Sequence, residues 1–359
     1  MKKLLPILVL ACLTALLALL PSVETRDAGS ERWAVGKVVA VDDSGVERHG
    51  LIEYGVQRLR VDFGGGEVGE ATNTLRAQLE LDKRFAVGDK AFVVFAGGSV
   101  QARDHWRLGW MGLLFALFAA LLVLFGGWTG AKALLSFVFS CLAVWKMLVP
   151  LCLKGYSAEG TAFATVAVLT GVIMYLVAGW TKKGLAAFAG AMLGIVASLA
   201  LAEFFTWAMN VNGATMPFVQ TLLYSGYAVD IADVFVGAMV LASSGAVMDL
   251  AMDIAAGVGE VARHSPDLGA RELFGSGLAI GRSVVGTMTT TLLLAYSGGY
   301  LTLLMVFAAQ GTRPVDFLNS TLVSAEMVKT LVGSFGLVLV APFTAIVSAA
   351  IFGRGRGRA

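Results

Sequence analysis

Long apolar segments are the sequence feature that most constrains this chain. After residue 107, seven such segments follow one another, and each approaches or exceeds the roughly 20 residues that an α-helix needs to cross a bilayer. Hydrophobic residues make up 57% of the 359 residues and charged residues only 14%, which is typical of a multi-pass helical membrane protein. The expected spans are residues 108–128, 131–151, 161–180, 184–209, 229–248, 283–309 and 325–352.

An eighth apolar segment opens the chain. Lys2 and Lys3 precede the apolar run 4–20, which has the charged start and hydrophobic stretch of a signal sequence. Residues 1–21 are therefore either a signal anchor that stays in the membrane or a signal peptide that is removed. No A-x-A pattern precedes Pro21, which favours the anchor, so the all-α bundle over residues 108–352 would have about seven to eight helices in total.

Residues 22–107 instead have the composition of a soluble domain. Short alternating apolar runs are separated by turns rich in glycine and aspartate, which predicts a small β-barrel-like domain of the OB or SH3 kind. The domain lacks a basic groove with interleaved aromatics, so nucleic-acid binding is not expected. Trp33, Tyr54 and Phe63 are interpreted as core residues. The candidate strands are residues 34–41, 50–54, 57–63, 67–73 and 90–95.

Basic residues in the short connections predict the orientation. If Lys2 and Lys3 lie inside, the β domain is extracytoplasmic and the basic tail 353–359 lies in the cytoplasm. The connections on the opposite side carry few basic residues. We therefore expect a multi-pass plasma-membrane protein with its C-terminus in the cytoplasm. The basic residues on the inner side would be Lys132, Lys182, Lys183, Arg263, Arg271 and Arg282.

Acidic residues follow one face of the helix expected from residue 229, which continues past the membrane span that ends at residue 248. At about 100° per residue, Asp249, Asp253 and Glu260 fall within roughly 40° of one another. A carboxylate within hydrocarbon costs about 2.5–3.5 kcal/mol on insertion scales, which favours a functional role. Alternatively, Asp249 lies at the inner boundary of the membrane, where water hydrates it. Glu203 is a further acid well inside an expected span.

Hydroxyls occupy one face of the next apolar segment. Ser283, Thr287 and Thr290 follow the i, i+4, i+7 spacing directly after Arg282. With the carboxylates of the preceding helix, these oxygens are suited to a proton or to a hard cation such as sodium, magnesium or calcium. Arg282 is expected either to pair with Asp249 across two helices or to act only as a topology residue.

Two expected spans are irregular. Gly298 and Gly299 interrupt the sixth, and Pro342 lies near the middle of the last. The glycine pair either breaks the helix and supplies backbone ligands, as in secondary transporters, or forms a kink or a very short hairpin loop. Both interpretations stay open.

Some further residues have structural interpretations. The spacings Gly190-xxx-Gly194 and Gly277-xxx-Gly281 predict close helix packing. Glu326 and Lys329, three residues apart, are interpreted as a local pair on one helix.

Several short motifs together carry a family resemblance. They are Gly245-Ala246-Val247-Met248-Asp249-Leu250-Ala251-Met252, then Gly281-Arg282 with Gly286-Thr287-Met288-Thr289, and, more weakly, Leu79-Glu80-Leu81-Asp82 with Gly88-Asp89-Lys90. On these residues the chain resembles the YibE/F-like family of bacterial multi-pass membrane proteins over most of its length. The resemblance implies the bacterial inner membrane but no agreed activity. Asp249 and Arg282 match the family pattern, whereas Asp253, Ser283 and Thr290 stand where we expect Ser, Asp and Asn.

The leading hypothesis is a permease or transporter component for a small solute or ion. The sequence contains no H-E-x-x-H, G-x-S-x-G, P-loop or Rossmann motif, so we expect neither an enzyme nor a cofactor, and scattered histidines and cysteines predict no metal site. The alternative is a non-transporting scaffold whose outer β domain binds a protein partner. Expected partners are the lipid bilayer and either a second copy or another membrane protein. The candidate ligand-binding residues are Glu203, Asp249, Asp253, Arg282, Ser283, Thr287, Thr290, Gly298 and Gly299.

Overall fold

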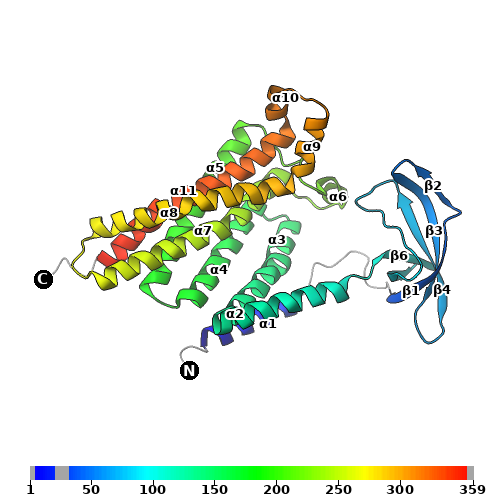
Figure 1. Ribbon diagram of the computed structural model, residues 1–359, viewed down its shortest axis with the longest axis horizontal. Coiled ribbons are helices and arrows are strands. Elements are labelled where there is room, and N and C mark those ends of the chain that lie inside the picture. Colours follow the sequence, from blue (N-terminus) through cyan, green and yellow to red (C-terminus); the bar gives the residue numbers. More distant parts are fainter. Residues whose placement is uncertain (1–4, 21–31, 354–359) are drawn as a thin grey trace. The chain divides into compact units, whose positions relative to one another are not determined.

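The computed structural model describes residues 5–20 and 32–353 (Figure 1). It divides the chain into two compact units, one over residues 23–125 and the other over residues 1–22 and 126–359. The first holds a β-barrel and the second most of the helices. Lys2, Lys3 and the arginines of the tail lie outside the described residues.

The β domain is a closed barrel with an added hairpin strand. Over residues 32–105 the strands pair in the order β1-β5-β6-β4-β3, and an additional pairing of β1 with β3 closes the barrel while β2 extends from β3. All these pairs are antiparallel except β4 with β6, which meet at Thr72 and Gln101. This order, with its one parallel pair, is that of an OB-type barrel. The strands are β1 Arg32–Asp42, β2 Val46–His49, β3 Ile52–Asp62, β4 Val68–Arg76, β5 Lys90–Ala96 and β6 Ser99–His105.

The expected break between strands near residue 55 is absent, because β3 runs continuously from Ile52 to Asp62. Gly55 makes this continuity feasible. Its φ of 126° is a backbone conformation that L side chains rarely adopt, and a Cβ there would collide with the carbonyl oxygen of Gly45. The sequence pattern missed this because glycine at that position reads equally well as a turn.

The barrel interior combines apolar side chains with a buried amide network. Gln57 is fully buried, and its Nε2 donates to Asp43 Oδ1 at 2.8 Å and to the Phe85 carbonyl at 3.0 Å. Its Oε1 accepts hydrogen bonds from Phe85 N and from Asn73 Nδ2. Two of the expected core aromatics are not in this interior, since Trp33 is 62% exposed and Tyr54 is 61% exposed. That part of the core prediction was wrong.

The helices agree with a membrane protein. Within the described residues, six helical segments are long and apolar enough to cross a membrane. Residues 108–153, expected as two spans, consist of two apolar helices that meet at Gly127, whose φ and ψ of 51° and −126° are non-helical. The helices are α1 Leu5–Leu19, α2 Leu108–Ala143, the π-helical η1 Val144–Leu148, α3 Val149–Leu153, α4 Ala158–Ala178, α5 Lys182–Ala208, α6 Val219–Tyr224, α7 Ile231–His264, α8 Ala270–Gly299, α9 Leu301–Ala309, α10 Pro314–Asn319 and α11 Thr321–Gly353.

Small residues bring α5, α7, α8 and α11 into close contact. A Cβ added at Gly190 would collide with Thr344 of α11, and one at Gly194 would lie 2.9 Å from Cβ of Val340 and 3.1 Å from Val247. On α8, Gly277 and Gly281 are equally tight against α11. Such close approach is how helices gain packing energy in lipid. The packing prediction for both glycine pairs is confirmed.

The α7–α8 pair is longer than the sequence suggested. Helix α7 continues sixteen residues past the expected membrane span to His264 and carries all three acids, as predicted, whereas α8 begins thirteen residues before the expected span, at Ala270. Buried residues such as Leu250, Ile254 and Val258 maintain the core-facing side of α7 beyond the first acid. The expected interruption of the sixth span is present directly after the glycine pair, because α8 ends at Gly299 and α9 begins at Leu301, with Tyr300 between them.

Candidate intramembrane site

Contacts between helices place Asp249 about halfway along the length of the helical bundle. Val247 of α7 contacts Gly194, which is 12 residues from Lys182 and 14 from Ala208, the two ends of α5. Asp249 lies two residues farther along α7. At about 1.5 Å per residue, its level is roughly 15 Å from the Lys182 end of α5. If α5 spans the bilayer, Asp249 therefore lies within the hydrocarbon region and not at its inner boundary.

Asp253 and Arg282 share one level along the α7–α8 pair. Ile254 of α7 packs against Gly281 of α8. Asp253 directly precedes Ile254, and Arg282 directly follows Gly281. Gly281 also contacts Ala341 of α11, the residue after Val340. These contacts place Arg282 deeper than expected for a residue that only sets topology.

The three acids of α7 lie on its exposed face. Asp249, Asp253 and Glu260 are all exposed, whereas the opposite side of the helix is buried. Glu260 differs from the others because its carboxylate pairs with Arg263 at 2.6 Å, near the end of the helix. Only Asp249 and Asp253 combine exposure with an intramembrane level, which is the costly arrangement for a carboxylate.

The anticipated ion pair between Arg282 and Asp249 is not formed. Among the residues that the structure describes, neither side chain makes a salt bridge, and Arg282 is exposed. The register explains this, because Gly281 contacts Ile254, so that Arg282 is level with Asp253 and not with Asp249.

The hydroxyls of α8 form an exposed stripe. Ser283, Thr287 and Thr290 donate to the carbonyl oxygens of Ile280, Val284 and Gly286 at 2.7, 2.9 and 3.1 Å. Because each hydroxyl proton is donated to a carbonyl oxygen of the same helix, each hydroxyl can offer a ligand only the lone pairs of its oxygen. The stripe is therefore an acceptor surface, suited to a cation and not to an anion.

Three candidates do not join this site. Gly298 and Gly299 lie at least eleven residues beyond Thr287 on α8, about 16 Å along the axis. Glu203 lies nine residues past Gly194 on α5, toward the opposite end from Lys182. Its carboxyl shares a hydrogen bond with Glu159 of α4, and Asp233 of α7 is close enough to interact.

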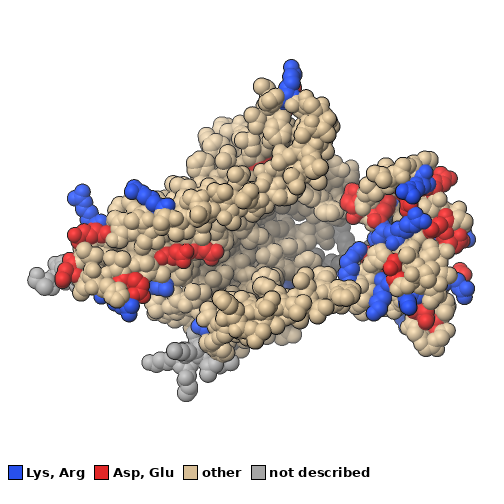
Figure 2. Space-filling model, viewed as in Figure 1, with Lys and Arg blue, Asp and Glu red and all other residues tan. Residues whose placement is uncertain are grey.

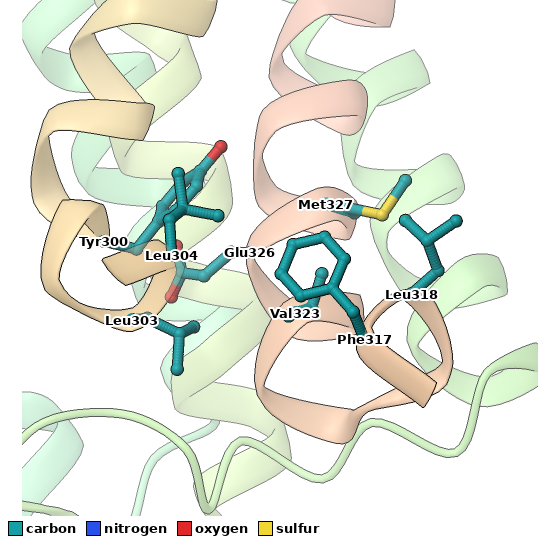
Figure 3. Close-up of a pocket in the computed structure, with 8 residues that line it drawn as sticks. All are labelled: Tyr300, Leu303, Leu304, Phe317, Leu318, Val323, Glu326 and Met327. Carbon is teal, nitrogen blue, oxygen red and sulfur yellow. The ribbon is translucent and has the colours of Figure 1, made fainter. Parts of the chain in front are cut away.

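The region after the helix break at Tyr300 contains a pocket that was not predicted from the sequence. A 190 Å³ pocket lies where α9, α10 and α11 meet, and Figure 3 shows Glu326 extending from α11 toward Tyr300 and Leu304. Lys329 Nζ lies 2.7 Å from Glu326 and 5.4 Å from the centre of the Phe235 ring. The local pair is confirmed, and Glu326 is also the charged residue in the lining of an otherwise largely apolar pocket. The sequence signal that could have indicated this pocket was Tyr300, the residue directly after Gly298 and Gly299.

Metal ligation needs several convergent ligands, which the described part of the chain does not offer. Over residues 5–20 and 32–353, no three His, Cys, Asp or Glu side chains lie close enough to hold a metal ion. A cation at Asp249 would therefore be held only transiently, with water completing its coordination.

Comparison with known proteins agrees with the helical part of this picture. A family model described as YibE/F-like protein matches residues 114–354, well over half of the chain. The match contains Asp249 and Arg282, whereas the barrel motif at residues 79–90 lies outside it. No curated protein and no solved structure matches the chain. With its apolar helices, the chain is an integral membrane protein that belongs to the YibE/F-like family.

Proposed function

We propose that this protein is a permease or transporter component of the bacterial inner membrane that moves a proton or a small hard cation. The observation that carries the proposal is the position of Asp249, exposed on α7 at an intramembrane level. A carboxylate there is stable only if it is protonated, hydrated in a cavity or neutralised by a cation. Each of these states is useful for transport.

The ligand chemistry supports a hard cation. Carboxylates of α7 and the hydroxyl oxygens of α8 are acceptors only, as described above. Hard cations such as sodium, magnesium and calcium prefer such oxygens. The sequence has no P-loop motif, so the energy for pumping would come from an ion gradient or from a separate ATPase subunit.

We also propose the orientation in which the barrel lies outside and the α7–α8 turn lies in the cytoplasm. Lys182 begins α5 and Arg263 ends α7, and the helix register brings these ends to the same side of the bundle. In Figure 2, the charged side chains visible on the helical unit gather mainly toward the end that holds this turn. A basic inner side is the expected distribution for a membrane protein.

A comparison of total cellular elements and small metabolites tests the proposal. Cells producing the wild type should show a change in one species, and cells producing Asp249→Asn at an equal membrane level should not. Glu260→Gln is the matched control, because Glu260 lies on the same face but near the helix end and paired with Arg263. If all three profiles equal that of empty cells, the transporter proposal is wrong.

The second candidate function is a scaffold that binds a protein through the barrel. The β2–β3 hairpin favours it, since Leu51, Ile52 and Tyr54 are 80%, 42% and 61% exposed. Exposed apolar side chains that adjoin one another are typical of protein contacts. Leu51→Asp with Tyr54→Ser should abolish a scaffold phenotype and leave transport unchanged.

A further inference from the structure

Aromatic residues gather where the barrel meets helix α2. The Trp33 ring lies 5.8 Å from that of Phe92 and 6.3 Å from that of Trp106, measured between ring centres. Trp33 is 62% exposed, and Trp110 in the first turns of α2 is 77% exposed. Tryptophans so exposed are unfavourable in water but suit the headgroup layer of a bilayer, where the ring is partly buried and its N–H stays hydrated.

The chain connectivity puts this cluster at the membrane surface. Strand β6 ends at His105 and α2 begins at Leu108, so only two residues separate the barrel from an apolar helix. Trp106 is one of them. Trp33 belongs to the first strand, far away in sequence, and reaches the same place through the pairing of β1 with β5.

A cavity of 680 Å³ opens at this junction. Its wall passes from the barrel to the membrane helix, with polar groups at the barrel side and apolar groups at the helix side. It is lined by Gly88, Asp89, Lys90, His105, Trp106, Arg107, Gly109, Trp110 and Leu113.

The charges of the cavity match a phospholipid headgroup. Lys90 and Arg107 supply cations, and Arg107 is held by Asp104 at 2.6 Å. Asp89 lies 3.8 Å from His105 and supplies an opposite charge. Lysine and arginine at the membrane surface bind lipid phosphates, and leucine and tryptophan below them suit the start of the acyl chains.

We propose that this cavity binds the phosphate-bearing headgroup of a phospholipid, with Trp33, Trp106 and Trp110 in the headgroup layer. The barrel is then seated on the leaflet from which α2 enters, with Lys90 and Arg107 on the phosphate. This site is independent of the transport proposal, since it lies in the barrel unit and uses none of the α7 and α8 residues.

Photo-crosslinking in the full chain tests the site. Trp33 and, separately, Trp106 are replaced by benzoylphenylalanine, and the protein is irradiated in vesicles of phosphatidylglycerol and phosphatidylethanolamine. Tyr54→benzoylphenylalanine is the matched control, because Tyr54 is an aromatic residue of the same barrel with nearly the same exposure as Trp33. Mass spectrometry should find phospholipid adducts at both tryptophan positions and none at position 54.

Charge reversal tests the headgroup contact. Lys90→Glu with Arg107→Glu should lower the adduct yield at position 33 by about tenfold, as expected when two cations near anionic lipid are reversed. Arg76→Glu with Arg103→Glu makes the same charge change at a different barrel cavity and should leave the yield unchanged. Equal adducts at positions 33 and 54, no adduct at 33 and 106, or equal loss with both double variants would overturn the proposal.

Discussion

The barrel and the helical unit differ in whether their key polar side chains have partners. In the barrel, the buried Gln57 and Asn73 bind one another and nearby backbone groups, and Arg84 pairs with both Asp43 and Glu53. In the described part of the helical unit, Asp249 and Asp253 make no salt bridge although they lie at intramembrane levels. The polar groups of the barrel therefore stabilise its fold, whereas Asp249 and Asp253 of α7 are expected to cost stability.

The largest effect should come from breaking the barrel network. Gln57→Leu removes the partner of Asn73 Nδ2, Asp43 and Phe85 N at once. At about 1–3 kcal/mol for each buried group left unpaired, the barrel should lose roughly 3 kcal/mol of unfolding free energy. Pulse proteolysis of the full chain in urea measures this. A loss below about 1 kcal/mol would mean that the network is not structural.

The opposite sign is expected in the helical unit. Asp249→Leu removes a carboxylate from an intramembrane level, so the protein should be as stable as the wild type or more stable, by up to about 2 kcal/mol, while transport is lost. Thermal unfolding in detergent and an uptake assay measure the two properties. A strongly destabilised variant would show that Asp249 has a structural role like that of Gln57.

A smaller, pH-dependent effect should be confined to the barrel. Burial acts to raise the pKa of Asp43, but hydrogen bonds from Gln57 and Arg84 prevail and hold this pKa below its ordinary value. The ionised form therefore stabilises the barrel above about pH 4, and the contribution disappears as pH falls through the lowered pKa.

The size of this pH effect follows from exposure. The side chains of Asp43 and Arg84 are 38% and 48% exposed, so water screens the pair and the contribution is less than about 1 kcal/mol. Barrel unfolding in urea between pH 6 and pH 3 measures it, and Arg84→Met should flatten the pH dependence. An unchanged slope in this variant would show that Arg84 does not affect the Asp43 carboxyl.

The smallest effect is expected for Thr290→Val. The Thr290 hydroxyl donates within its own helix and is exposed, so stability should change by less than about 0.5 kcal/mol. If its oxygen helps to hold the cation, the apparent affinity in uptake assays should fall by less than about tenfold. Thr291→Val, which removes a neighbouring exposed hydroxyl with the same local bond, is the control and should leave affinity unchanged.

Residue patterns predicted the classes of both units well. Segment length and hydropathy gave the apolar helices, and the alternation in residues 22–107 gave a barrel, because both depend on local periodicity. Trp33 and Tyr54 were misplaced in the core because alternation does not tell which face of a strand is covered. For Trp33, the exposure of the side chain is one of the observations that support the proposed lipid contact.

The candidate site was only partly predictable, because depth and register depend on packing between distant helices. Spacing placed the acids of α7 on one face, as the structure has them. It could not show that Val247 packs against Gly194, and so could not distinguish an intramembrane Asp249 from one at the boundary. For the same reason, residue spacing grouped Glu203 and Gly298 with Asp249 and the α8 hydroxyls, although Glu203 and Gly298 lie several helical turns away along α5 and α8.

Ion flux into proteoliposomes is the measurement that most directly tests the role of Asp249. Purified wild type, Asp249→Asn and Glu260→Gln would be reconstituted at equal density, and proton, sodium, magnesium and calcium fluxes followed under an imposed gradient. A cation transporter that depends on Asp249 should give flux of one of these ions through the wild type and Glu260→Gln and none through Asp249→Asn. Equal flux through all three proteins would contradict this role of Asp249.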